Sequence, residues 1–308
     1  MTDPYDEGGA GVGGSPALAA GEAGIADVAA ARPLRKEVWK RFCRNKLAVV
    51  GLAFVVLLFL IAVFAPLIAP YEFAERTSEF RKGPSRDHLF GTDNIGHDVF
   101  SRVVYGSRIS LRTGILATAI SLMIGIFLGA IAGFFGGIFD TLIMRTTDMF
   151  LAIPYIILAV AIASTLGRSE RSVIIVLGVT GWLAITRIVR ASFLSLKQLE
   201  YVEATRALGF SHWRIMFRHI LPNALQPIIV YGTISIGGVV LAEAALSFLG
   251  VGPTSPTPAW GLMISEAKPY LSPSPHMLLF PGAALFLTVL AFVFVGDGLR
   301  DALDPKLK

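Results

Sequence analysis

Long uncharged apolar stretches, separated by short polar segments, dominate the hydrophobic pattern of this chain. The first stretch, 47–69, has 23 residues without a charge. As a helix it would be about 34 Å long, which is enough to cross a hydrocarbon core of about 30 Å. Five more stretches follow: 113–139, 141–167, 172–186 extending towards 190, 223–242 continuing to about 250, and 277–296. The pattern predicts an all-α membrane protein with six transmembrane helices.

Composition and charge agree with a membrane protein and give it an orientation. The chain is 54% hydrophobic and 16% charged, with a mean hydropathy of +0.66. If the N-terminus is cytoplasmic and six spans alternate, the inside segments hold most of the 27 lysines and arginines, as the positive-inside rule requires. We therefore expect both termini in the cytoplasm of a multi-pass membrane protein. The net charge of +5 then reflects topology and does not predict nucleic-acid binding.

These boundaries divide the chain into five regions. They are a disordered cytoplasmic tail (1–31), a basic juxtamembrane segment with the first transmembrane helix (32–70), an extracytoplasmic loop (71–110), a core of five transmembrane helices (111–300) and a cytoplasmic C-terminal tail (301–308). The basic residues of 32–46 have two interpretations: an anchor for lipid headgroups or a topology signal alone. The second is favoured on sequence grounds.

A search for catalytic or metal-binding patterns gives little. His88, Asp93, His97 and Asp98 in the 71–110 loop could be metal ligands, but polar groups that tie down turns and a helix start are the favoured interpretation. The glycine spacing of "GTDNIG" suits a phosphate loop, but the lysine and hydroxyl residue that should follow are missing. We expect no catalytic site, no metal site and no cofactor bound by this chain.

Four glycines recur at a period of four in the second stretch: Gly125, Gly129, Gly133 and Gly137. On a helix they would form one smooth stripe that lets another backbone approach closely. This favours a packed helix interface over a flexible hinge. The neighbour could belong to this chain or to a partner.

A few charged residues fall within or beside the apolar stretches. Arg145 and Asp148 are three residues apart, so we expect them to pair on one helix face. Glu243 lies inside the fifth stretch, where a carboxylate is costly unless it faces protein or a wet pathway. A role in the pathway and a structural pair with a partner subunit are equally open for Glu243.

The segment "EATRALGFSHWRIMFRHILPN" is the most polar one in the second half of the chain. Its pattern predicts a helix, a bend at Gly209, a second helix capped by Ser211, and Pro222 in the first turn of the next span. The spacing places an aromatic and aliphatic set on one face: Phe210, Trp213, Phe217 and Ile220. Glu203 and Arg206 are expected to pair. Such an element could lie on the lipid surface or bind a groove on another protein.

The segment around 193–221 resembles the EAA loop of ATP-binding cassette importer permeases. The matching residues are Glu203-Ala204-Thr205, Gly209 and His219-Ile220-Leu221-Pro222, with Thr205 and His219 as departures from the usual pattern. Four further stretches are similar to the C-type subunit of the dipeptide/oligopeptide/nickel permeases: "HLFGTDNIGHDVFSRVVYGSRISL", "FDTLIMRTTDMFLAIP", "LAEAALSFLGVG" and "GDGLRDALDPKL". The resemblance covers about 36–308.

The resemblance implies a type I importer permease fold and a set of partners. These are a similar B-type permease, two ATPase subunits that carry ATP and magnesium, and an extracytoplasmic binding protein, besides membrane lipid. It also implies that the EAA loop forms a coupling helix. Glu203, Ala204 and Gly209 would set its docking geometry, Phe210, Trp213 and Phe217 its contact area, and Arg206 and Arg214 its charge complementarity.

Peptides are the expected substrate, with nickel, glutathione or sugar-like solutes as alternatives. Three other functions compete with the importer interpretation. An ion-driven secondary transporter would show internal repeats and broken helices. An intramembrane enzyme would need a nucleophile or metal set within the spans, and a structural scaffold would not need the EAA pattern.

Overall fold

The structure is a computed structural model of the 308-residue chain that describes residues 34–304. The expected disordered tail, 1–31, and residues 305–308 lie outside the described residues. The helices are α2 (Leu34–Arg44), α3 (Lys46–Val63), α4 (Ala65–Ile68), α5 (Val99–Phe135), α6 (Gly137–Leu151), α7 (Tyr155–Leu166), α8 (Glu170–Thr180), α9 (Trp182–Leu196), α10 (Glu200–Ala207), α11 (His212–Arg214), a π-helix (Ile215–Ile220), α12 (Leu221–Phe248), α13 (Trp260–Ala267), a short 3₁₀ turn (Lys268–Tyr270) and α14 (His276–Leu303). Within 34–304 there is no β-strand beyond one isolated bridge. The all-α prediction is confirmed.

Five helical segments are long and apolar enough to cross a membrane: Lys46–Val63, Val99–Phe135, Glu170–Leu196, His212–Phe248 and His276–Leu303. The expected third span, 141–167, is not one straight helix. It is divided into α6 and α7, which meet at an angle of 88°. Pro154, directly before α7, explains the break because proline has no N–H to donate and disfavours helical geometry in the residue before it. Residues 34–304 thus hold five candidate spans, or six if the bent pair is one span.

The second span begins earlier than the hydrophobic pattern predicts. Helix α5 starts at Val99, where the Asp98 side chain accepts a hydrogen bond from the Ser101 N–H, and has 37 residues. Its length is about 55 Å, so the last part of the expected 71–110 loop is helical. The helix ends at Gly136 and Gly137, whose positive φ angles of 68° and 54° suit glycine.

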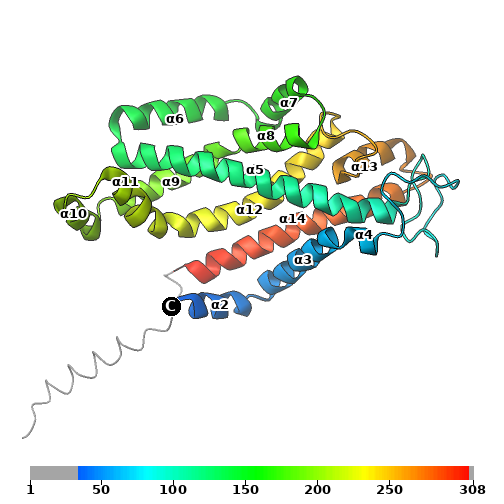
Figure 1. The fold of residues 1–308 in the computed structure, drawn as a ribbon, viewed down its shortest axis with the longest axis horizontal. Coiled ribbons are helices and arrows are strands. Elements are labelled where there is room, and N and C mark those ends of the chain that lie inside the picture. Colours follow the sequence, from blue (N-terminus) through cyan, green and yellow to red (C-terminus); the bar gives the residue numbers. More distant parts are fainter. Residues whose placement is uncertain (1–33, 305–308) are drawn as a thin grey trace, which may run out of the picture.

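The long helices lie roughly parallel, with α5 running through the middle of the bundle (Figure 1). Helix α5 packs against α8, α9 and α12, and α14 packs between α3 and α12. Helix α2, the C-terminal end of α14 and the α10–α11 segment lie at one end of the bundle. The segment that joins α4 to α5 and helix α13 lie at the other end.

The glycine stripe of α5 packs on α9 of the same chain. A Cβ atom on Gly125 would overlap the Ile185 side chain, one on Gly129 would lie 2.6 Å from the Thr186 carbonyl oxygen, and one on Gly133 would lie 2.6 Å from the Phe193 Cβ. The packing interpretation therefore holds for these three glycines. Gly137 does not belong to the stripe: it begins α6, and its Cβ would meet nothing within 4 Å.

Candidate coupling segment and intramembrane cavity

The α10–α11 segment has the helix–bend–helix form that the sequence predicts. Helix α10 ends at Ala207, and Gly209 follows with φ of 74°, a left-handed conformation that glycine adopts without a steric penalty. Ser211 occupies the N-cap position of α11 with extended backbone, although its side chain makes no capping hydrogen bond. Pro222 lies in the first turn of α12, as expected.

One side of this segment is anchored in the bundle and the other is exposed. Val202 and Thr205 of α10 are buried, and the Thr205 hydroxyl donates to the Val202 carbonyl at 2.7 Å. This internal hydrogen bond explains how a threonine is accommodated where the EAA pattern has alanine. Glu203, Ala204 and Arg206 are exposed on the other side of α10.

The predicted aromatic face is only partly correct. Trp213 and Phe217 stack with ring centroids 5.6 Å apart and are 52% and 37% exposed, whereas Ile220 is fully buried. The cause is the π-helix at Ile215–Ile220, whose i→i+5 turns rotate the following residues relative to an α-helix. Ile220 therefore joins the buried side, and Trp213 and Phe217 form a separate exposed pair.

Two of the three arginines in the 203–223 segment contact aromatic rings instead of carboxylates. The Arg206 guanidinium lies 5.7 Å from the Phe134 ring centroid, and that of Arg214 lies 5.2 Å from the Phe210 ring centroid. The expected ion pair between Glu203 and Arg206 is not formed. Within the described part of the chain Glu203 has no ion-pair partner, so its carboxylate is available to another molecule.

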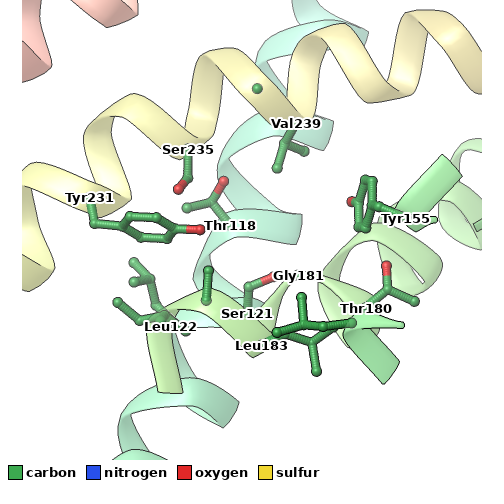
Figure 2. A pocket seen from close by; sticks show the side chains of 14 residues that line it. Thr118, Ser121, Leu122, Tyr155, Thr180, Gly181, Leu183, Tyr231, Ser235 and Val239 are labelled. Carbon is green, nitrogen blue, oxygen red and sulfur yellow. The ribbon is translucent and has the colours of Figure 1, made fainter. Parts of the chain in front are cut away.

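A cavity of about 310 Å³ lies between α5, α12 and the junction of α8 with α9. Its polar lining consists of hydroxyl side chains: Thr118, Ser121, Tyr155, Thr180, Tyr231 and Ser235. Figure 2 shows Tyr231 and Ser235 of α12 facing Thr118 of α5, with Tyr155 and Thr180 on the opposite side. None of the lining side chains is charged. The cavity can hydrogen-bond to a polar solute without contributing a charge of its own.

These cavity residues are absent from the sequence-based predictions. The only signal they leave in the sequence is the presence of isolated hydroxyl residues, such as Thr118, Ser121 and Ser235, within apolar spans. Serine and threonine hydroxyls in a span usually bond to the carbonyl of the preceding turn. Such residues therefore do not indicate a cavity unless the helix packing is known.

The two aspartates of α6 form ion pairs with α9 and not within α6. Asp148 accepts from Arg187 at 2.5 Å, and Asp140 accepts from Arg190 at 2.6 Å. The expected Arg145–Asp148 pair is thus wrong, because Asp148 faces α9 while Arg145 is exposed. Asp148 therefore links α6 to α9.

Glu243 lies inside this chain and is 1% exposed. Its carboxylate accepts from the Ser247 hydroxyl at 2.7 Å and from the Ser110 hydroxyl at 3.5 Å. These two serines provide the hydrogen bonds that a buried carboxyl group requires. Glu243 does not line the cavity.

The polar residues before α5 form a buried network that ties the loop to the bundle. The Asp93 carboxylate accepts from the N–H groups of Ile95 and His97 and from Arg102 at 2.5 Å, while Asp98 caps α5 and lies 2.9 Å from His88 Nδ1. Burial alone would raise the pKa of Asp93, but Arg102 and the two N–H groups lower it below its usual range. These contacts favour the structural interpretation of the four residues over a metal site.

Comparison with known proteins adds the family. Residues 125–308 match the family described as binding-protein-dependent transport system inner membrane component, and residues 33–84 match the N-terminal transmembrane domain of oligopeptide transport permease C. The chain is 45% identical over 274 residues to the dipeptide transport system permease protein DppC of Alkalihalophilus pseudofirmus, which covers 89% of this chain and 90% of that protein.

Two further relatives are named for another substrate. The chain is 44% identical over 276 residues to the glutathione transport system permease protein GsiD of Pectobacterium atrosepticum, covering 89% of this chain and 91% of that protein. It is 46% identical over 275 residues to GsiD of Escherichia coli, covering 88% and 90% of the two chains.

The fold is also similar to a solved structure. A chain of the MetNI methionine ABC transporter in an inward-facing conformation superposes with a TM-score of 0.55 at 21% identity, covering 67% of this chain and 98% of that chain. This similarity supports the type I importer permease fold. Together these matches show that the chain belongs to the family of binding-protein-dependent transport system inner membrane components, in its oligopeptide permease C branch.

Proposed function

We propose that this chain is a transmembrane permease subunit of an ATP-binding cassette importer for di- or oligopeptides, coupled to separate ATPase subunits through the α10–α11 segment. The observation that carries the proposal is the exposed helix–bend–helix segment at the end of a bundle of this family. Glu203, Arg206 and Trp213 are exposed on the surface of this segment, while the residues on its other side are buried in the bundle.

The way this segment is connected supports a coupling role. Ile215, Met216 and Ile220 anchor it in the bundle, and the π-helix continues directly into α12 without a loop. A displacement applied to the exposed side would therefore be carried into α12 as a rigid body. Helix α12 contributes Tyr231 and Ser235 to the intramembrane cavity. The geometry thus offers a continuous path from a docking surface to a solute-binding space.

On this proposal the energy source and the substrate receptor are other chains. Two ATPase subunits would bind ATP and magnesium, a B-type permease would complete the pathway, and a binding protein would deliver the substrate outside. The α10–α11 segment and both ends of the described chain would face the cytoplasm. Their common location at one end of the bundle supports this orientation (Figure 1).

Peptides are the proposed substrate because one matching family is named for oligopeptide transport and one relative is named for dipeptide transport. Glutathione is a second candidate because the GsiD relatives match at 44% and 46% identity. Nickel and other small solutes are less well supported, since the cavity lining holds hydroxyls and no carboxylate, imidazole or thiol.

The test is ATP-dependent uptake in proteoliposomes that contain the tagged chain with its co-purified partner chains. Uptake of a labelled dipeptide and of labelled glutathione is measured for Glu203→Lys and Gly209→Pro. Proline cannot adopt the positive φ of Gly209, and a lysine reverses the charge offered for docking. We expect the uptake rate of both variants to fall at least about tenfold, which corresponds to about 1.4 kcal/mol of activation free energy.

Glu200→Lys is the matched control, because Glu200 is exposed on the same helix and undergoes the same change of charge. It should retain uptake and co-purified ATPase chains. Unchanged uptake in Glu203→Lys and Gly209→Pro would refute the coupling assignment. If the wild type takes up glutathione but no dipeptide, the coupling assignment stands and glutathione replaces peptides as the proposed substrate.

A further inference from the structure

Helix α2 is an amphipathic helix that precedes the first span. Val38 and Phe42 lie one turn apart on its apolar face, and Phe42 is only 4% exposed. Trp39 stacks on Phe42 with ring centroids 5.9 Å apart and is 58% exposed. The helix thus places an exposed indole ring at the membrane boundary, where tryptophan is enriched.

An apolar groove of about 520 Å³ lies between α2, α3 and α14. The side chains that line it come from the apolar face of α2, the second turn of α3 and the last turns of α14, and include Val38, Trp39, Phe42, Leu52, Val295 and Leu299. Every lining residue is apolar. A groove of this composition offers an occupant dispersion contacts and burial of apolar surface. Among its lining side chains, only the Trp39 indole N–H can donate a hydrogen bond.

Cations extend along the other side of α2. Glu37 is occupied by Arg41, whose guanidinium lies 2.9 Å from the Glu37 carboxylate. This leaves Lys36, Lys40 and Arg44, spaced one turn apart and exposed, without an ion pair among the residues that the structure describes. The acidic residues at the end of α14 do not line the groove. Asp297 and Asp301 line a neighbouring cavity with Asn45.

We propose that this groove binds one acyl chain of an anionic phospholipid, whose headgroup is held by Lys36, Lys40 and Arg44. The apolar lining accounts for the chain, and the unpaired cations account for the charge of the headgroup. A soluble anion would make no use of the groove, and a zwitterionic lipid would leave three positive charges unmatched. Long lysine and arginine side chains reach the headgroup region while their stems stay in apolar surroundings.

The proposal selects between the two sequence-based interpretations of 32–46. A topology signal requires only basic residues on one side of a span. It does not require an amphipathic helix that closes an apolar groove against α3 and α14. The proposal goes beyond the transport function and does not depend on which solute is carried.

Trp39 reports directly on the occupant of the groove. The full chain, with its co-purified partners, is reconstituted in phosphatidylcholine vesicles containing increasing fractions of brominated phosphatidylglycerol or brominated phosphatidylcholine. Bromine quenches nearby indole rings, and the difference between the wild type and Trp39→Phe isolates the signal of Trp39 from the other three tryptophans. The measured quantity is the affinity for phosphatidylglycerol relative to phosphatidylcholine.

We expect the wild type to prefer phosphatidylglycerol by about tenfold or more, since each basic residue near an anionic surface contributes about 1 kcal/mol, or roughly fivefold. The triple variant Lys36→Gln/Lys40→Gln/Arg44→Gln should lose this preference but still be quenched. Replacing both lysines by arginine should retain it. Leu299→Trp, which fills the groove, should reduce site-specific binding of both lipids; its Trp39 signal is measured against the Leu299→Trp/Trp39→Phe double variant.

The matched control removes three exposed charges at the other end of the bundle: Arg76→Gln/Arg86→Gln/Arg171→Gln. It should keep the full preference. Elution volume and unfolding temperature in detergent show whether each variant is folded. A wild-type preference near one, or a preference unchanged by neutralising α2, would overturn the proposal. Crosslinking of Trp39→Cys to another protein segment in place of lipid would also overturn it.

Discussion

The two ends of the bundle use charged and aromatic residues in opposite ways. Around the start of α5, a buried set of charged groups binds one another: Asp93 and Arg102 are 6% and 1% exposed and form an ion pair. In the α10–α11 segment, Glu203 and Arg206 are exposed and do not pair. Polar residues at the first end hold the fold together, whereas those at the second end remain available to another molecule.

The difference shows how a structural polar cluster can be distinguished from a binding surface. At the α5 end the Asp93 carboxylate accepts hydrogen bonds from the backbone N–H groups of Ile95 and His97 as well as from Arg102, and Asp98 accepts from the Ser101 N–H. In the α10–α11 segment the buried positions are occupied by Ile215, Met216 and Ile220, and the charges lie outside them. Removing a residue should therefore lower stability at the first end and lower activity at the second.

The largest expected effect follows from removing Asp93. Asp93→Ala leaves the Arg102 guanidinium buried, with only Glu266 at 3.4 Å to compensate it. Deleting one partner of a buried pair typically costs about 3–5 kcal/mol. We expect a loss of this size in the free energy of unfolding, measured by denaturant titration in detergent micelles.

Asp87→Ala is the control for this change, because Asp87 is an exposed aspartate in the same segment. It should change stability by about 0.5 kcal/mol or less. The double variant Asp93→Ala/Arg102→Met removes both charges and should recover part of the loss. If Asp93→Ala cost no more than Asp87→Ala, the α5 end would not differ from the α10–α11 end in the way described.

A smaller loss is expected in the interface that joins the α10–α11 end to the rest of the bundle. Gly129→Ala would place a Cβ 2.6 Å from the Thr186 carbonyl oxygen and 2.7 Å from the Val189 Cβ. Overpacking of this kind costs about 1–3 kcal/mol, partly offset by up to about 1 kcal/mol of helix propensity. The same unfolding measurement should therefore show a net loss.

Gly282→Ala is the counterpart in α14, where an added Cβ would meet nothing within 4 Å. It should be neutral or stabilise the protein by up to about 1 kcal/mol. An equal response of Gly129 and Gly282 would mean that the α5–α9 contact is not close packed. The stripe would then be consistent with the hinge interpretation.

The sequence allowed a correct prediction of the elements governed by local rules. The apolar stretches identified the spans, and the period-four glycines identified a packing stripe. Gly209 identified the bend after α10, and Pro222 identified the first turn of α12. These features depend on backbone conformation and hydropathy, which are properties of a few neighbouring residues.

Features that depend on tertiary packing were predicted less well. Asp148 pairs with Arg187, which is 39 residues away, and not with the nearby Arg145. The π-helix separates Ile220 from Trp213 and Phe217, because one widened turn changes which face each later residue occupies. The hydroxyl-lined cavity arises where α5 and α12 meet α7, α8 and α9, and no local pattern specifies this packing.

The smallest stability effect, and the sharpest contrast with Asp93, is expected for Trp213. Trp213 is 52% exposed and stacks on Phe217, so Trp213→Ala should cost only about 1 kcal/mol or less in unfolding. If this ring forms part of the docking surface, the same variant should retain much less of the ATPase chains during affinity purification, because exposed tryptophans often dominate interface energies. Ile220→Ala, in the same segment but fully buried, should instead cost about 2–5 kcal/mol. A Trp213→Ala variant that loses stability like Ile220→Ala but keeps its ATPase partners would show that this ring holds the fold together, and the two ends of the bundle would no longer differ in purpose.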